Sequence, residues 1–250
     1  MTERYSDYDA FASMYNEHWG SFATRLVPVL EHLVLNALPS EARILDLCCG
    51  TGQLAHALCA QGFKVTGIDG SESMTAIART NAPDATFKTD DARSFATDGG
   101  FHAALSTFDS LNHVMSLEEL RSVFDNVYRA LIGGGVFAFD LNTEEGFRTR
   151  WRGSHGYVED DHACVARSSH LPDERTGKLE ITVFFRREGG WERSDLTLLQ
   201  RCYGEEEIVK ALQSAGFAGV RTYDGGTDLG EELPRYPGRQ FFVCEKSTTR

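Results

Sequence analysis

Arg43-Ile-Leu-Asp-Leu-Cys-Cys-Gly-Thr-Gly-Gln-Leu-Ala55 joins an apolar run to two closely spaced glycines and then to a helical pattern. The run 43–48 predicts a short strand, and apolar residues from Leu54 to Cys59 recur at helical spacing until Gly62. Glycines allow a sharp backbone turn and a close approach to a ligand. In open α/β folds such a turn lies at the carboxyl edge of the sheet, where cofactors bind. The sequence therefore predicts a strand, a ligand-binding turn and a helix.

The same alternation of strand and helix continues along the chain. Further strands are predicted at 63–69, 85–89, 101–107 and 136–140. A helix opens at the capping box Ser116-Leu-Glu-Glu119 and is expected to stop at Gly133-Gly134-Gly135. Strands that alternate with helices at this spacing predict a mostly parallel sheet with helices on both faces. The predicted fold class is therefore α/β, doubly wound.

Other patterns flank this alternation. Tyr8, Phe11, Tyr15, Trp19 and Phe22 recur every three or four residues, which predicts one helical face, and a second helix is expected to end near Pro39. Between 155 and 203 apolar and polar residues alternate, as in antiparallel hairpins. A helix from Gly204 and strands at 220–223 and 240–245 complete the pattern.

These patterns predict one domain over residues 1–250 with an elaboration. It comprises N-terminal helices at 1–40, an α/β core at 41–154 and 204–250, and an antiparallel β insertion at 155–203.

Charge and composition restrict the partners. The chain has 37 Asp and Glu against 25 Lys and Arg, a net charge of −12, which repels phosphate backbones and anionic lipid. We therefore expect a small-molecule substrate, no nucleic acid and no membrane, since no run approaches the roughly 18 apolar residues of a membrane span. The N-terminus lacks the apolar core of a signal peptide and the six cysteines are scattered, which indicates free thiols and a cytoplasmic protein. The oligomeric state, monomer or homodimer, stays open.

The glycine turn alone fits two cofactors. Gly50-x-Gly52-x-x-Ala55 also matches the dinucleotide fingerprint of NAD enzymes, and Asp69, 17 residues past Gly52, can accept both hydroxyls of an adenosine ribose in either case. A carboxylate at Asp46 would lie beside the doubly charged pyrophosphate of NAD, which is unfavourable away from water. S-adenosylmethionine has a cationic sulfonium and ammonium instead, so an acidic loop attracts it.

With these motifs the chain resembles the class I S-adenosylmethionine-dependent methyltransferases. The first motif of that family matches Ile44–Gly52, the acidic second motif matches Val65–Asp69 with Ser71-x-x-Met74 after it, and the adenine-edge motif matches Thr89–Arg93. The resemblance implies a seven-stranded Rossmann-like methyltransferase sheet with a β-rich insertion after strand five. It assigns cofactor binding to Tyr8, Tyr15, Arg25, Asp46, Gly50, Thr51, Gly52, Asp69, Gly70, Met74, Asp91, Ala92 and Thr107.

In detail, the resemblance implies that Met74 packs on the adenine and Asp91 contacts its exocyclic amine. Tyr15, and less directly Tyr8, would lie near the methionine end of the cofactor, and Arg25 would pair with its carboxylate.

Within the superfamily the chain is similar to bacterial small-molecule enzymes, including N,N-dimethyltransferases of amino sugars. The shared features are the tyrosine-rich segment Tyr8–Tyr15, the segment Phe108–His113 after strand four and the β-rich insertion. The N-terminal helices and the insertion would then form the substrate cavity. An amine acceptor is slightly preferred over a hydroxyl.

Methyl transfer is an in-line attack on a carbon that the sulfonium already activates, so alignment can supply roughly 7–11 kcal/mol. An amine can lose its proton to water before it binds, so a base is not obligatory. His113 is the best base candidate and Tyr15 a second catalytic candidate; His113 can equally cap a turn or orient the substrate. Asp109, Asn112, Asp140 and Asn142 are weaker candidates for holding substrate polar groups.

Other functions remain open in the sequence. His155, His162, Cys164 and His170 match no familiar ligand spacing, so we expect no metal there. The glycine pattern is also compatible with an NAD-dependent oxidoreductase, which is the second possibility. A non-catalytic module that binds S-adenosylmethionine or a partner is the third.

Overall fold

A seven-stranded sheet forms the centre of the protein, for which the computed structural model describes residues 7–248. The strand order is β10-β11-β5-β4-β1-β2-β3. The strands are β1 (Arg43–Leu47), β2 (Lys64–Asp69), β3 (Thr86–Thr89), β4 (Phe101–Ser106), β5 (Leu131–Asn142), β10 (Phe217–Asp224) and β11 (Arg239–Lys246). β1 to β5 are parallel, whereas β11 runs antiparallel to both β5 and β10. The order reverses beside β1, so the carboxyl end of β1 is a switch point where such sheets bind ligands.

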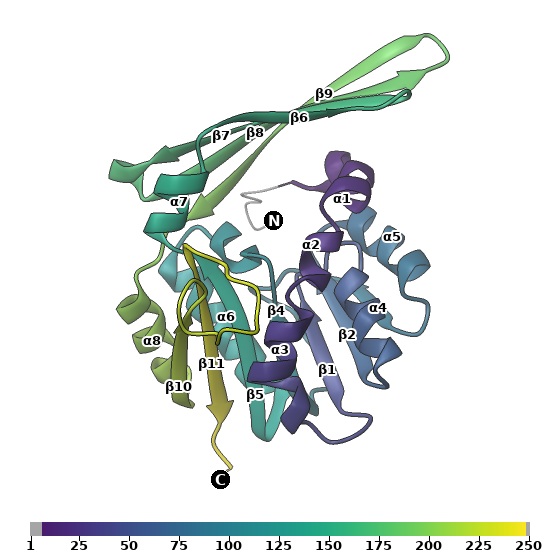
Figure 1. The fold of residues 1–250 in the computed structure, drawn as a ribbon. Coiled ribbons are helices and arrows are strands. Elements are labelled where there is room, and N and C mark those ends of the chain that lie inside the picture. Colours follow the sequence, from purple (N-terminus) through teal and green to yellow (C-terminus); the bar gives the residue numbers. More distant parts are fainter. Residues whose placement is uncertain (1–6, 249–250) are drawn as a thin grey trace.

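Helices cover both faces of this sheet (Figure 1). They are α3 (Val27–Leu33), α4 (Gln53–Ala60), α5 (Glu72–Asn81), α6 (Leu117–Ala130) and α8 (Glu205–Ser214). Apolar residues of α6 and α8, such as Phe124 and Ile208, share a core with Leu45 of β1, while those of α3, α4 and α5 share another with Ile44. Successive residues of β1 therefore face opposite layers. The doubly wound α/β prediction is confirmed.

A second sheet lies across the carboxyl edge of the first (Figure 1). It is an antiparallel meander of β6 (Gly153–Val158), β7 (His162–Leu171), β8 (Thr176–Arg187) and β9 (Gly190–Arg201). The predicted β-rich insertion after strand five is thus confirmed. The helix α7 (Glu144–Arg150), which the sequence analysis did not predict, connects it to β5, and Thr143 caps that helix by accepting a hydrogen bond from Gly146 N.

The N-terminal segment is not the single long helix that the aromatic spacing predicts. It contains the 3₁₀ turn η1 (Asp9–Phe11), α1 (Ala12–His18) and α2 (Ser21–Thr24), followed by α3 and a second 3₁₀ turn, η2 (Leu35–Ala37). The break falls at Trp19 and Gly20, where a side chain on Gly20 would collide with Gln53 at the start of α4. Glycine at this position therefore lets the junction of α1 and α2 pack closely on α4.

The fifth strand is also longer than predicted. β5 begins at Leu131, directly after α6, so the three glycines expected to stop the helix lie within the strand. Gly134 has φ +80°, a backbone conformation that favours glycine, and the register between β4 and β5 shifts near this point. The glycines therefore permit an irregular strand start rather than a loop.

Two further observations concern the chain as a whole. Within the described residues, no helix combines the length and the apolar character that a membrane crossing requires. All six cysteines are free thiols, as the sequence analysis expected.

Candidate active site

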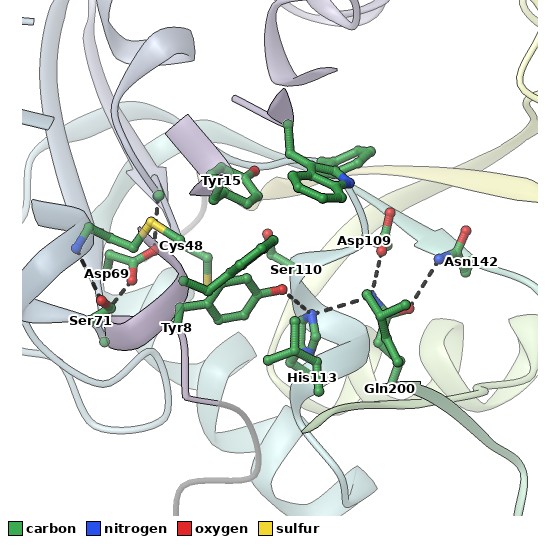
Figure 2. Close-up of a pocket in the computed structure, with 18 of the residues that line it drawn as sticks. Tyr8, Tyr15, Cys48, Asp69, Ser71, Asp109, Ser110, His113, Asn142 and Gln200 are labelled. Carbon is green, nitrogen blue, oxygen red and sulfur yellow. Dashed lines mark hydrogen bonds between the residues drawn. The ribbon is translucent and has the colours of Figure 1, made fainter. Parts of the chain in front are cut away.

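A cavity of about 480 Å³ lies between the carboxyl edge of the large sheet, the N-terminal helices and the insertion sheet. Figure 2 shows Asp69, Ser71 and Cys48 at one end of it, Asp109, Gln200 and Asn142 at the other, and Tyr8, Tyr15 and His113 between them. The predicted site residues that line it are Tyr8, Tyr15, Gly50, Asp69, Gly70, Met74, Asp91, Ala92 and His113. The predicted cofactor-binding residues that do not line it are Arg25, Asp46, Thr51, Gly52 and Thr107; of the weaker substrate candidates, Asp109 and Asn142 line it and Asn112 and Asp140 do not.

The glycine turn after β1 forms the floor of the first end. Gly50 has φ +54° and Gly52 has φ +84°, the left-handed region that favours glycine. A Cβ on Gly52 would lie 2.9 Å from Cβ of Ala78, so this glycine allows α4 to approach α5. A Cβ on Gly50 would face the Tyr15 ring at 3.5 Å. Gly52 thus serves packing, while Gly50 keeps the space below Tyr15 open.

Asp69 lies at the carboxyl end of β2 beside this turn. Its carboxylate accepts hydrogen bonds from the backbone N–H of Gly50 and of Ser71, both at 2.9 Å. Ser71 in turn caps α5 by accepting from Met74 N and donates to Asp9 Oδ1 at 2.6 Å. These bonds hold the carboxylate in one orientation at the cavity wall, which suits the predicted ribose contact; that contact stays a prediction.

Asp46 lies one layer behind the turn. It is 1% exposed in the middle of the sheet, and its Oδ2 has no hydrogen-bond partner among residues 7–248. Burial and the nearby charge of Asp69 raise the pKa of Asp46 to about 8. A buried carboxyl without a partner cation favours its neutral form. Asp46 therefore favours its protonated form and lies behind the cavity lining, so the charge that the sequence analysis used against NAD is not displayed at the cavity.

Asp91 lies at the edge predicted to bind adenine, next to Ala92. Arg93 donates to Asp91 in a two-pronged contact, with Nε 3.0 Å from Oδ1 and Nη2 2.7 Å from Oδ2, and also pairs with Glu119 at 2.6 Å. Such a bidentate contact fixes a carboxylate in its plane. If Asp91 also accepts a hydrogen bond from the exocyclic amine of adenine, as predicted, its carboxylate binds that amine and Arg93 together.

Arg25 and Thr107 lie away from the lining. The guanidinium of the exposed Arg25 stacks over the Phe22 ring at 4.3 Å, and it is Phe22 that faces the cavity. Thr107 follows β4 and is 7% exposed, with its carbonyl accepting from Ser110 Oγ at 2.8 Å. In this arrangement both support the walls, and their predicted cofactor contacts stay predictions.

His113 ends the 3₁₀ turn η3 (Ser110–His113) and faces the middle of the cavity (Figure 2). Its Nδ1 lies 2.7 Å from the carbonyl oxygen of Leu199, which can only accept, so Nδ1 carries the proton. Its Nε2 then accepts from the Tyr8 hydroxyl at 3.0 Å and from Gln200 Nε2 at 3.3 Å. Desolvation lowers the pKa of His113. The imidazole is therefore neutral, with a lone pair directed at the cavity.

A buried charged network holds the turn that carries His113. Arg239 pairs with Asp109 at 2.5 Å and with Asp140, and Asp140 also accepts from the backbone N–H groups of Phe108 and Asp109 at 2.8 and 2.9 Å. Phe108 and Asp109 have φ of +61° and +54°, which is uncommon for residues with side chains. Strained backbone of this kind persists only where its surroundings fix it.

Gln200 extends the network to the insertion sheet, and sequence analysis missed its role. Its amide nitrogen donates to Asp109 Oδ2 at 2.5 Å, and its amide oxygen accepts from Asn142 at 3.1 Å. The sequence does contain a signal for Gln200. Leu198 and Gln200 are two residues apart on β9 and therefore face the same side, so a polar residue follows an apolar one on the inward face. Arg239, which is 5% exposed, gave no comparable signal because its partners lie 99 and 130 positions away.

Comparison with known proteins agrees with this geometry. A family model described as a methyltransferase domain matches residues 44–135. The putative methyltransferase YqeM of Bacillus subtilis (strain 168) is 31% identical over 218 residues, which cover 85% of this chain and 87% of YqeM. The dTDP-3-amino-3,4,6-trideoxy-alpha-D-glucopyranose N,N-dimethyltransferase of Streptomyces venezuelae is 30% identical over 198 residues, 78% of this chain and 82% of that enzyme.

Solved structures show the same fold. The structure of CalS10 with bound S-adenosylmethionine, an amino pentose methyltransferase from Micromonospora echinaspora involved in calicheamicin biosynthesis, superimposes with a TM-score of 0.71. The two sequences are 23% identical, and the match covers 95% of this chain and 97% of CalS10.

The chain therefore belongs to the class I S-adenosylmethionine-dependent methyltransferases of the bacterial small-molecule type. It is an enzyme, its cofactor is S-adenosylmethionine, and the oxidoreductase and the non-catalytic module are set aside. The residues around the turn fit this cofactor. Gly50 leaves room beneath Tyr15, Met74 offers an apolar surface and Asp69 offers a fixed carboxylate.

Proposed function

We propose that this methyltransferase methylates an amine of a small metabolite, with the acceptor nitrogen bound next to His113. The observation that carries the proposal is the placement of that imidazole: Nδ1–H is held by the carbonyl of Leu199, and Nε2 faces the cavity, where Tyr8 and Gln200 lie within hydrogen-bond distance. A lone pair at this point can accept an N–H of the substrate amine and so direct the amine's own lone pair elsewhere, toward the methyl group. The cofactor, when bound, supplies a methyl carbon already activated by its sulfonium.

The proton balance also favours His113. When the new N–C bond forms and the C–S bond breaks, a primary or secondary amine becomes an ammonium with a proton to lose. Nε2 of His113 can take that proton because the imidazole is neutral, and because burial lowers its pKa it passes the proton on to solvent rather than keeping it. Tyr8 now donates to Nε2 at 3.0 Å, and its own pKa is raised by burial, so it stays a donor that an incoming amine must replace.

The far half of the cavity supports a polar acceptor with an apolar face. Polar groups of Gln200, Asn142 and Ser168 share this wall with the apolar side chains of Leu179 and Leu198. A sugar ring has the same combination of hydroxyls at its edge and an apolar face. Relatives whose names specify N,N-dimethylation of dTDP-activated amino sugars, at 27% to 31% identity, agree with an amino sugar as the acceptor.

A panel of paired acceptors tests the proposal. The purified chain is incubated with methyl-labelled S-adenosylmethionine and amino sugars, free and nucleotide-activated, each beside the analogue with a hydroxyl in place of the amine. We expect mass increases of one or two methyl groups on the amines alone. If the hydroxyl analogues are methylated and the amines are not, the amine assignment is refuted. His56→Gln is the control variant and should keep the wild-type turnover, because His56 lies at an exposed position of α4.

A further inference from the structure

Two histidines from distant parts of the chain meet above the cavity. His18, the last residue of α1, and His162, the first residue of β7, face each other with Nε2 atoms 2.9 Å apart. The carboxylate of Glu17 lies 3.8 Å from His162 Nε2. One ligand atom from each of the three residues lies within 4.8 Å of the others. The sequence analysis considered only histidines of the insertion and therefore missed this group.

We infer that Glu17, His18 and His162 bind a divalent transition-metal ion, with Zn²⁺ as the best match. Two imidazoles and one carboxylate are ligands that zinc accepts, at about 2.0–2.2 Å, with a fourth position left for water. Two nitrogens bound tetrahedrally to one ion lie roughly 3.3 Å apart, so the imidazoles need to separate by only a few tenths of an ångström. Glu17 is 57% exposed, which leaves its side chain free to rotate toward an ion.

The surroundings orient both imidazoles. Asp161 accepts from His162 Nδ1 at 2.8 Å, which leaves the lone pair of His162 on Nε2, directed at His18. A carboxylate behind a ligating histidine fixes its orientation and raises its basicity. The His18 ring stacks on Tyr157 with centroids 4.4 Å apart. Both rings are therefore held in place without an ion.

Charge at this position also favours a cation. The turn between β6 and β7 carries Glu159, Asp160 and Asp161 in succession, and Glu17 faces it from α1. A bound divalent ion would reduce this local excess of negative charge.

The ion would join two elements that enclose the cavity. α1 carries Tyr15, and Trp19 directly follows His18; both side chains line the cavity. His162 belongs to the insertion sheet that forms the opposite wall. The ion would thus fix the N-terminal helices to the insertion without contact with the methyl-transfer site.

Titration of the full-length chain, after removal of any affinity tag, with Co²⁺ and with Zn²⁺ tests this site. Visible absorption of Co²⁺ reports four-coordinate binding, and calorimetry gives the stoichiometry for Zn²⁺. We expect one ion per chain, at least tenfold weaker binding in His18→Gln and Glu17→Gln, and roughly 10- to 100-fold weaker binding in Asp161→Asn. His56→Gln is the matched control, because His56 is exposed on α4, and should bind as the wild type does.

Thermal unfolding gives a second readout that does not depend on methyl transfer. At a hundredfold excess over Kd, Zn²⁺ should raise the Tm by roughly 5–10 °C in the wild type and not in His18→Gln. Three results would each overturn the inference: no saturable binding by the wild type, equal affinity in His18→Gln and Glu17→Gln, or a thiolate-to-Co²⁺ absorption band, since this group contains no cysteine. Because His18 and Glu17 are not fully buried, folding of their variants is not at risk.

Discussion

The protonation state of His113 predicts a pH limit for catalysis. Because the pKa of His113 is lowered from its ordinary value near 6.5, Nε2 is unprotonated at neutral pH and can accept a hydrogen bond. This acceptor is lost only when the pH falls below that value and the imidazole becomes protonated. We expect kcat of the wild type, at saturating acceptor, to decline on the acid side with this group, while kcat/KM also follows the ionisation of the acceptor amine. His113→Gln should lower kcat by roughly 10²-fold, remove that acid decline and leave the affinity for S-adenosylmethionine unchanged.

The measurement is a pH–rate profile of both proteins, with cofactor binding followed by calorimetry. Near-normal turnover of His113→Phe at high pH would show that the imidazole only positions the acceptor.

Asp69 is expected to supply cofactor affinity. Asp69→Ala leaves the ribose hydroxyls unpaired and should weaken S-adenosylmethionine binding by roughly 1–3 kcal/mol, as measured by calorimetry. Asp84→Ala is the control, since Asp84 is exposed just before β3 and does not line the cavity. Equal affinity of Asp69→Ala and the wild type would refute the ribose assignment.

Asp46 predicts a pH dependence of stability. Its pKa is about 8 in the folded protein against 3.8 ordinarily, so the folded state holds one proton more than the unfolded state between these values. The free energy of unfolding therefore falls as the pH rises, by up to roughly 1.4 kcal/mol per unit for this group. Asp46→Asn should lessen the decline between about pH 6 and about pH 8 in denaturant titrations. If the free energy of unfolding fell equally with pH in the wild type and in Asp46→Asn, Asp46 would be ionised in the folded state.

At the scale of elements, η3 depends on a contact from β5. Asp140→Ala removes the acceptor for two buried N–H groups and one partner of the buried Arg239, so we expect a loss of roughly 3–5 kcal/mol in stability. The exposed pair of Arg193 and Asp195 on β9 supplies the comparison, and Arg193→Ala should leave the unfolding midpoint unchanged. Chemical denaturation of both variants measures the difference. A midpoint for Asp140→Ala equal to the wild type would show that the turn holds itself.

Elements whose signals are local could be predicted from the sequence, and those set by distant contacts could not. The strand, turn and helix around Gly50 follow from periodicity and glycine spacing within a few residues. The break at Trp19 and Gly20 could not, because the aromatic spacing continues across it and the close packing of Gly20 on Gln53 joins residues that are distant in the sequence. The same distinction holds for the site. Asp69 ends a predicted strand and His113 lies in the short segment after another, whereas Gln200 enters the site from 87 positions beyond His113.

At the scale of the whole molecule, the insertion sheet and the N-terminal helices share one core. Phe11 and Met14 pack with Cys164, Ile181 and Leu198, so the sheet supports the helix that places Tyr15 over Gly50. Loosening this core should therefore affect cofactor binding at a distance.

Two isoleucines separate that effect from general destabilisation. Ile181 lies in the core shared by α1 and the insertion, while Ile208 lies in the core beneath α6 and α8, and they are 1% and 0% exposed. Truncation to alanine should cost roughly 2–5 kcal/mol at either position. Only Ile181→Ala should also weaken S-adenosylmethionine binding, measured by calorimetry well below the Tm, because only it releases the support of Tyr15. Equal weakening by Ile208→Ala would mean that cofactor affinity follows overall stability, and that the insertion serves as a wall for the acceptor alone.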